Sequence, residues 1–324
     1  MKRCSVSVAV SCLIFSPLAS ASHMASTSLS TGSSSSINTE SAVPLAAGAW
    51  SIAVRYEEQQ FDRLSDESLL SLAEADPDAD LHSVESVETT LFNISYGLNE
   101  DLSLGLSLPV VERQDIRAPH FHEEDNEFEI EQEGNSRGIG DTKLYGLWRF
   151  SQRENHDTSL IFGIGVPTGK HDDTSPEGEA YEQEFQPGSG SWDPLIGISH
   201  SRYFGRITLD ASATYNLVGE GSQQTDLGDW ITYNAGLSYL LSSNSNRDLR
   251  LVVEANGLWR DKLKQAGETE RNAGGNWLNL SPGIIVGRNN WSVFANVALP
   301  IVNDPGGDQD EQDYRLQIGF QFGL

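Results

Sequence analysis

The chain has 324 residues, and its 21 basic and 47 acidic residues give a formal net charge of −26. This charge excludes a nucleic-acid-binding protein, which needs a basic surface to meet phosphates. Only 38% of the residues are hydrophobic, and after the N-terminal region no apolar run approaches the roughly 18–20 residues of a spanning helix. The 7 Trp, 9 Tyr and 12 Phe argue against disorder. The classes of protein that these exclusions leave are a soluble acidic β-protein and an outer-membrane barrel.

The N-terminus has the pattern of a secretory signal peptide. Two basic residues precede an apolar stretch from Val6 to Leu18, which ends in the small residues Ala19-Ser20-Ala21. We expect residues 1–21 to be removed and the protein to be exported. The mature chain would then contain no thiol, which excludes disulfides and thiolate metal sites, because both cysteines lie in the removed segment: Cys4 and Cys12.

Residues 22–46 are rich in Ser, Thr and small residues and show no periodicity. This composition is typical of a flexible periplasmic lead, and equally of a segment tucked into a lumen. One hypothesis follows from its position just before the first strand, namely that the segment acts as a plug. Residues 47–324 are predicted to form a single outer-membrane β-barrel.

Apolar residues alternate with polar or small ones in twelve runs along the rest of the chain. With the residues that flank them, the runs approach the roughly 9–11 residues that a tilted strand needs to cross a bilayer. The pattern therefore predicts an all-β protein of about twelve antiparallel strands. In chain order the runs are 50–56, 92–96, 102–108, 144–150, 160–166, 192–198, 207–215, 231–239, 249–259, 278–286, 291–299 and 314–324.

The connections between these runs alternate strictly between long and short. The long ones, at about 62–86, 110–138, 167–190, 218–229, 261–275 and 300–312, would all lie at one end of the structure. This is the wiring of an up-and-down barrel in the bacterial outer membrane, with short periplasmic turns and long external loops. Aromatic residues at both ends, among them Tyr203 and Trp230, are assigned to lipid-facing belts. A soluble β-sandwich, the alternative, gives no reason for this alternation.

Three short motifs make the chain resemble one known family. They are Gly138-Ile139-Gly140-Asp141, Val166-Pro167-Thr168-Gly169 and Ser281-Pro282-Gly283. Over residues 47–324 the chain resembles the outer-membrane transporter family labelled meta-pathway of phenol degradation. The resemblance implies passage of small, often aromatic or hydrophobic, compounds and supplies no catalytic residues. Barrels of this kind usually end in Phe, whereas this chain ends in Leu324, so the C-terminal strand carries a weaker signal for the barrel-assembly machinery.

Charged residues fall on the predicted inward face of the strands. Such charges are costly in a membrane unless they line water or pair with one another. They would either form salt-bridge ladders that fill a narrow barrel or set the selectivity of a pore. The lumen-facing candidates are Arg55, Asp141, Lys143, Arg149, Asp210, Arg250, Glu254, Arg260 and Arg315.

The second long loop contains two histidines among many acidic residues. Oxygen-rich loops bind Ca²⁺, and histidines two apart add ligands for a transition metal, but no known ligand spacing is present. The alternative is a solvated loop that shares divalent cations with lipopolysaccharide phosphates. The weak metal candidates are His120, His122, Glu123, Glu124 and Asp125.

The sequence thus favours a non-enzymatic channel that passes small molecules by passive or facilitated diffusion, without nucleotide or bound cofactor. Its expected partners are outer-membrane lipid, lipopolysaccharide, a small-molecule solute and the barrel-assembly machinery, and not nucleic acid. One alternative is a structural or surface-binding barrel with a closed lumen. A more distant alternative is a lipid hydrolase that uses the pair His200-Ser201, although this pair lies beside a predicted periplasmic turn.

Overall fold

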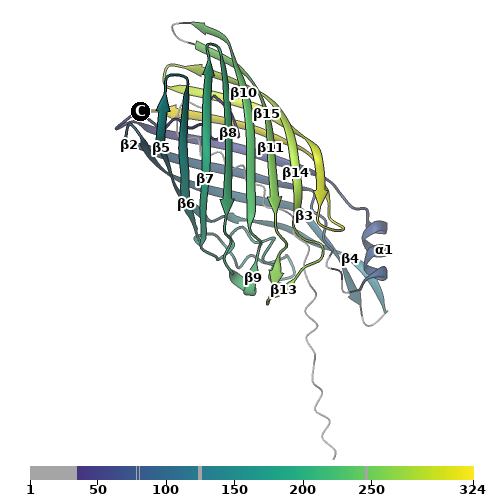
Figure 1. Ribbon diagram of the computed structural model, residues 1–324. Coiled ribbons are helices and arrows are strands. Elements are labelled where there is room, and N and C mark those ends of the chain that lie inside the picture. Colours follow the sequence, from purple (N-terminus) through teal and green to yellow (C-terminus); the bar gives the residue numbers. More distant parts are fainter. Residues whose placement is uncertain (1–34, 78, 80, 123–125, 245–246) are drawn as a thin grey trace, which may run out of the picture.

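The computed structural model describes residues 35–77, 79, 81–122, 126–244 and 247–324. Twelve long antiparallel strands form a closed barrel (Figure 1), because the first strand pairs with both the second and the last. Each predicted run overlaps one of these strands, so the predicted fold class is confirmed. The barrel strands are β1 (Trp50–Asp62), β2 (Ser86–Asn99), β3 (Leu102–His122), β5 (Thr142–Arg153), β6 (His156–Val166), β7 (Asp193–Phe204), β8 (Ile207–Asn216), β10 (Trp230–Asn244), β11 (Arg247–Arg260), β14 (Gly275–Arg288), β15 (Trp291–Pro305) and β16 (Glu311–Gly323).

Side-chain burial alternates along the strands with the period of two that pleating imposes. On β11, Val253 is 46% exposed while the adjacent Glu254 is 1% exposed. Most of the exposed residues on the outward face are apolar, and they occur on every barrel strand. A continuous apolar band of this kind needs lipid to cover it, as in outer-membrane barrels.

The remaining elements lie at the end opposite the short turns (Figure 1). Helix α1 (Asp66–Ala75) begins after Ser65, whose Oγ accepts a hydrogen bond from the N–H of Ser68 and so caps the helix. None of the helices in the described ranges is both long and apolar enough to cross a membrane. The shorter elements are η1 (Ser222–Gln224), β9 (Thr225–Asp226), β12 (Lys264–Gln265) and β13 (Glu268–Thr269).

The prediction of a long loop over 110–138 is wrong. β3 continues past the barrel wall and pairs with β4 (Glu127–Ile139) in a hairpin whose register runs from Val110↔Ile139 to His122↔Glu127. The apolar residues of this hairpin, Phe128 and Ile130, pack with α1 around the buried Leu69. Glutamates alternate with these two residues, so the high charge of the segment hid an ordinary strand pattern.

Two aromatic residues assigned to the lipid belts instead face inward. The ring of Trp230 lies under the Nζ of Lys143, 4.8 Å from the ring centroid. The hydroxyl of Tyr203 donates to Asp157 Oδ2 at 2.9 Å. Both residues lie near strand ends, where closeness to the membrane interface says nothing about which face of the strand a side chain occupies.

Replacing an outward apolar residue near the middle of a strand by lysine is expected to destabilise the protein in lipid. Ile198 on β7 is 50% exposed, and a lysine at the bilayer midplane of a barrel costs about 2–4 kcal/mol. Urea unfolding in vesicles, followed by tryptophan fluorescence, would measure the loss for Ile198→Lys. The control is Glu177→Lys in an exposed external loop. Equal stabilities of the two variants would contradict a lipid-covered outer face.

Candidate functional site

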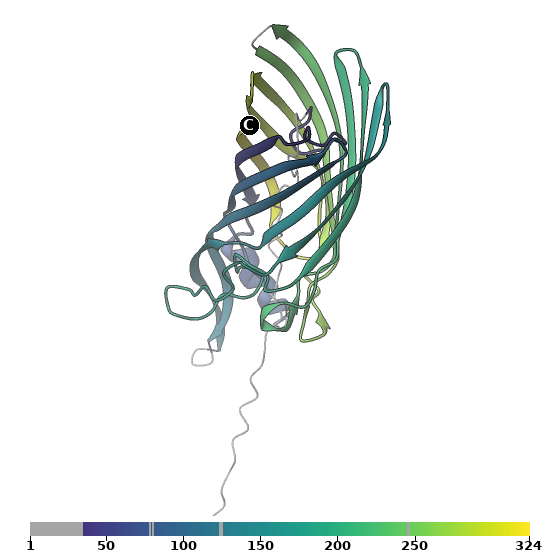
Figure 2. The same cartoon turned by 90° about the vertical axis from the view of Figure 1, so that its left-hand side faces the viewer.

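The interior of the barrel contains the beginning of the described chain (Figure 2). We call residues 35–46 the lumen segment. Its first six residues, Ser35 to Glu40, are all buried. The segment precedes β1 directly, so the chain passes through the lumen before it enters the barrel wall. This is the location required by the hypothesis that the N-terminal region acts as a plug.

Two of the predicted lumen-facing carboxylates hold the lumen segment. Glu254 accepts three consecutive main-chain N–H groups, from Ile37 at 3.3 Å, Asn38 at 3.0 Å and Thr39 at 2.7 Å. Asp210 accepts the hydroxyl of Ser36 at 2.7 Å and also that of Ser35. Hydrogen bonds to a buried carboxylate are among the stronger ones in proteins. Both carboxylates therefore serve as anchors for this segment.

Arg55, a cation, binds the same segment through a main-chain carbonyl. Its Nη2 donates to the carbonyl of Ile37 at 2.7 Å, and its Cζ lies over the ring of Phe294, 5.1 Å from the ring centroid. Ile37 packs with Phe294, Val252 and Ile285 in a small apolar cluster on the lumen side. Glu254 and Arg55 thus meet main-chain groups of the segment, and Asp210 meets its serine hydroxyls. Ile37, the one large apolar side chain of residues 35–40, has an apolar pocket.

Small polar side chains of the wall make room for the rest of the segment. Ala42 donates its N–H to Ser201 Oγ at 2.9 Å and accepts from Ser159 Oγ at 2.6 Å. Leu45 donates to Ser103 Oγ at 2.7 Å. Sequence reasoning missed these serines, although their signal, serine repeated on the inward face of several strands, was present.

The external end of the lumen is spanned by the connection between β6 and β7, which we call the mouth loop (residues 167–192). Its buried Glu184 interacts electrostatically with Arg113 on β3 and Arg260 on β11. These strands are six positions apart in the twelve-strand order, on opposite sides of the barrel. Arg113 also donates to the carbonyl of Phe185 at 3.1 Å. The mouth loop therefore crosses the opening.

Asp141 was predicted to lie on the inward face of a strand, and this prediction is wrong. The residue lies in the connection between β4 and β5. Its carboxylate accepts the N–H of Gly169 at 2.9 Å and both the N–H and the hydroxyl of Ser189 at 2.6 Å. It thus ties together the two ends of the mouth loop. A Cβ on Gly169 would lie 2.6 Å from the Cα of Gly188, so this crossing requires glycine. The motifs around Asp141 and Gly169 are a structural anchor.

The remaining predicted lumen charges pair with partners on the same face. Arg149 lies near the short turns and pairs with Asp101 at 3.0 Å and Asp157 at 3.6 Å. Arg315 and Glu57, both buried, pair at 3.8 Å between neighbouring strands. Such pairs satisfy buried charge and narrow the barrel.

Two further predicted residues have other surroundings. Lys143 lies over Trp230 on the lumen side, as noted above, close to the external end. Arg250 is half-buried and shares its face of β11 with Val252 and Glu254. These positions agree with the inward orientation that the alternation predicted.

A cluster of histidines and glutamates lies on the external hairpin. His120 Nε2 is 3.4 Å from Glu133 Oε1, and His122 Nε2 is 3.4 Å from Glu131 Oε1 across the same hairpin. The structure adds His82, whose Nε2 lies 3.2 Å from Glu182 Oε2 of the mouth loop. The other weak metal candidates, Glu123, Glu124 and Asp125, lie outside the described residues.

In this cluster, groups of opposite charge shift the pKa values further than burial does. Burial alone would lower the pKa of His82, but Glu182, Glu133, Glu184 and Asp310 together raise it above its ordinary value. Burial would likewise raise the pKa of Glu133, yet the hydrogen bond with His120 and the charge of His82 lower it. Sequence reasoning placed Glu133 in the acidic segment that follows His120 and His122, but it missed His82 and Glu182, because they come from two other connections.

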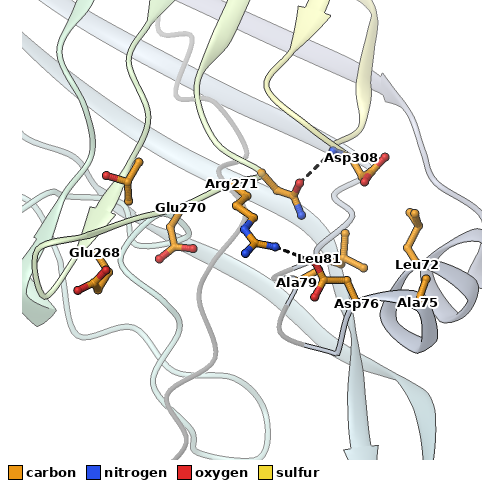
Figure 3. A pocket seen from close by; sticks show the side chains of 11 residues that line it. Leu72, Ala75, Asp76, Ala79, Leu81, Glu268, Glu270, Arg271 and Asp308 are labelled. Carbon is orange, nitrogen blue, oxygen red and sulfur yellow. Dashed lines mark hydrogen bonds and ion pairs between the residues drawn. The ribbon is translucent and has the colours of Figure 1, made fainter.

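A hollow of about 310 Å³ lies between α1 and the connection from β11 to β14 (Figure 3). Leu72 and Leu81 line one side, and Glu268 and Glu270 line the other. Arg271 closes part of it through an ion pair with Asp76 at 3.2 Å. This hollow lies outside the barrel wall.

His200 and Ser201 point to opposite sides of the wall, as neighbours on a strand must. His200 is exposed on the outer face and hydrogen-bonds with Thr158 Oγ1 at 2.9 Å. Ser201 is buried on the lumen side and donates to Asp210 Oδ1 at 2.5 Å. They therefore form no nucleophile–base pair.

These features define a twelve-stranded barrel of the outer-membrane type with an occupied lumen. A family model described as "Putative MetA-pathway of phenol degradation" matches residues 79–301, and the chain belongs to this family. No curated protein matches the sequence significantly.

Comparison with solved structures finds outer-membrane barrels. The "COG4313 outer membrane channel" from Pseudomonas putida F1 aligns with a TM-score of 0.62 and 13% identity, covering 89% of this chain and 100% of that chain. The "CymD monoaromatic hydrocarbon channel" aligns with a TM-score of 0.44 and 10% identity, over 86% and 100% of the two chains. At 13% identity the first of these similarities shows a shared fold.

Proposed function

We propose that the protein is an outer-membrane channel for small aromatic or other largely apolar solutes, and that the lumen segment controls their passage. The observation that carries this proposal is the segment itself, which donates hydrogen bonds to Glu254 and Asp210 and accepts one from Arg55 inside the barrel. Polar contacts of this kind exchange with water on release, whereas a permanently filled barrel needs only side-chain packing. The segment is therefore an occupant that can be displaced.

The class of solute rests on the family and on the lining of the lumen. The family description refers to phenol degradation. Inward aromatic residues, Tyr145 and Phe294, stand among hydrogen-bonding serines and charges. Such a lining suits a ring that carries a polar group. Export through cleavage of residues 1–21, and residence in the outer membrane of a Gram-negative cell, belong to the same proposal.

A structural or surface-binding barrel is the second candidate. It is favoured by one observation, that both the lumen segment and the mouth loop occupy the route through the barrel. The two candidates differ in flux. A channel conducts or passes solute once its occupants are displaced, and a structural barrel does not.

The test compares Glu254→Gln with the wild-type protein in proteoliposomes and planar bilayers. A hydrogen bond to a charged group contributes about 1.5–3 kcal/mol, so removing this charge is expected to raise the released fraction of the segment about tenfold. Phenol flux and ionic conductance should rise accordingly. The matched control is Asp157→Asn, a buried lumen-side carboxylate whose partners are Arg149 and Tyr203, near the short turns. Absence of flux in all three proteins would favour the structural barrel.

A further inference from the structure

We propose that His82, Glu182, Glu184 and Glu133 form a binding site for a divalent transition metal ion, for which Zn²⁺ is the probe. The site lies at the external end of the barrel. It joins three segments: the connection after α1, the external hairpin and the mouth loop. The metal would thereby fasten the mouth loop to the hairpin.

The geometry brings the ligand atoms close enough to share one ion. One ligand atom from each of His82, Glu182 and Glu184 lies within 4.8 Å of the other two. Nε2 of His82 is 3.2 Å from Glu182 Oε2 and 3.8 Å from Glu133 Oε1. Ligands at about 2.0–2.2 Å from a tetrahedral Zn²⁺ lie about 3.4 Å from one another, so small rotations of the glutamates suffice.

Packing fixes the histidine in place. The side chain of His82 is only 6% exposed, and its ring lies against that of Phe185 with 4.9 Å between the centroids. Phe185 is itself fully buried, and its carbonyl is held by Arg113 and Ser136. A ligand whose ring orientation is set by its neighbours binds a metal without further ordering.

An acidic hollow provides the route to this site. A cavity of about 330 Å³ lies beside it, lined by His120, Glu131, Glu133 and Glu182 among others. His120 Nε2 lies 3.4 Å from Glu133 Oε1, the same atom that faces His82, so the two imidazoles share one carboxylate. A cleft lined by carboxylates concentrates divalent cations from the medium.

The mixture of donors selects the class of metal. Ca²⁺ and Mg²⁺ prefer oxygen ligands alone, whereas an imidazole nitrogen together with carboxylates suits Zn²⁺ and its neighbours in the transition series. A metal that binds only when the three segments are assembled stabilises that assembly by mass action. If the channel proposal holds, bound metal will also reduce flux.

The binding test uses the full-length folded protein in detergent, freed of metal by chelation. Zn²⁺ is titrated against a chromophoric chelator, and Ca²⁺ and Mg²⁺ are added as competitors. We expect one Zn²⁺ site that excess Ca²⁺ does not displace. His82→Gln and Glu182→Gln should each weaken Zn²⁺ binding about tenfold or more. The control is His200→Gln, a histidine on the outer face of the barrel away from the mouth.

A second readout keeps the proposal testable if His82→Gln fails to fold. Glu182 has a side chain that is 32% exposed, so Glu182→Gln preserves the packing of the loop. Hydrogen exchange of the mouth loop should slow when Zn²⁺ is added to the wild-type protein, and should not slow in Glu182→Gln. Zn²⁺ binding that is unchanged in both variants, or displaced equally by Ca²⁺, would overturn the site. Zn²⁺ binding without any change in flux would leave the site standing and count against the channel proposal.

Discussion

Joining the lumen segment to the barrel wall by a disulfide is expected to suppress solute flux under oxidising conditions and to restore it on reduction. The pair is Ser36→Cys with Gly236→Cys. A Cβ on Gly236 would lie 3.3 Å from the Cβ of Ser36, close to the roughly 3.5–4.5 Å of disulfides. The chain has two native cysteines, Cys4 and Cys12, and cleavage after residue 21, as proposed, would remove both.

The expected effect is large because a crosslink holds the segment in place. A covalent bond to the wall keeps the segment in the lumen of every crosslinked molecule, so flux should fall to that of the uncrosslinked fraction of the sample. Phenol flux into vesicles, measured before and after reduction of the same sample, gives the ratio directly. Ser36→Cys alone, with and without oxidant, controls for the substitution. Equal flux in the oxidised and reduced double variant would show that the segment does not control passage.

Removing the carboxylate of Asp141 is expected to release the mouth loop. Three donors lose their acceptor in Asp141→Ala, the N–H of Gly169 and the N–H and hydroxyl of Ser189. Hydrogen bonds to a charged group contribute about 1.5–3 kcal/mol each and do not add fully, so we expect a local loss of about 3–5 kcal/mol. Hydrogen exchange at Gly169 and Ser189 would measure it.

An independent variant tests the same anchor by crowding it. In Gly169→Ala the new Cβ would lie 2.6 Å from the Cα of Gly188 and 2.8 Å from the carbonyl carbon of Gly140. Both are backbone atoms, so the two chain crossings must separate. The control is Gly287→Ala on β14, where the nearest atom would be 3.8 Å from the Cβ. If exchange of the mouth loop in Gly169→Ala matched that of this control, the anchor would not be what holds the loop.

The barrel could be predicted because its determinants are local and periodic. A strand that crosses lipid must place apolar residues on every second position, and a one-residue shift would bury the wrong face. This is why the inward orientation of Glu254, Asp210 and Arg55 followed from alternation alone. The strict alternation of loop lengths likewise placed the long loops at one end.

The predictions were wrong where charged residues obscured the alternation of apolar and polar residues, and at strand ends, where the alternation was not used to assign a face. The external hairpin was missed because its glutamates resembled a solvated loop, although Phe128 and Ile130 alternate with them. The end positions Trp230 and Tyr203 were assigned by their distance from the turns, which carries no information about the face. Asp141 was placed on a strand because its neighbours belong to one.

The sequence by itself thus determined the twelve strands, their inward and outward faces and the position of a serine-rich segment before the first of them. Only the tertiary structure decided what occupies the lumen and the mouth. Glu254 accepts main-chain N–H groups, which every residue but proline possesses. No side-chain pattern in residues 35–46 could therefore predict this contact. Closure of the barrel brings three connections that are distant in the sequence to one end, and this is why His82 contacts Glu133 and Glu182. The spacing of these residues along the chain does not predict the contacts.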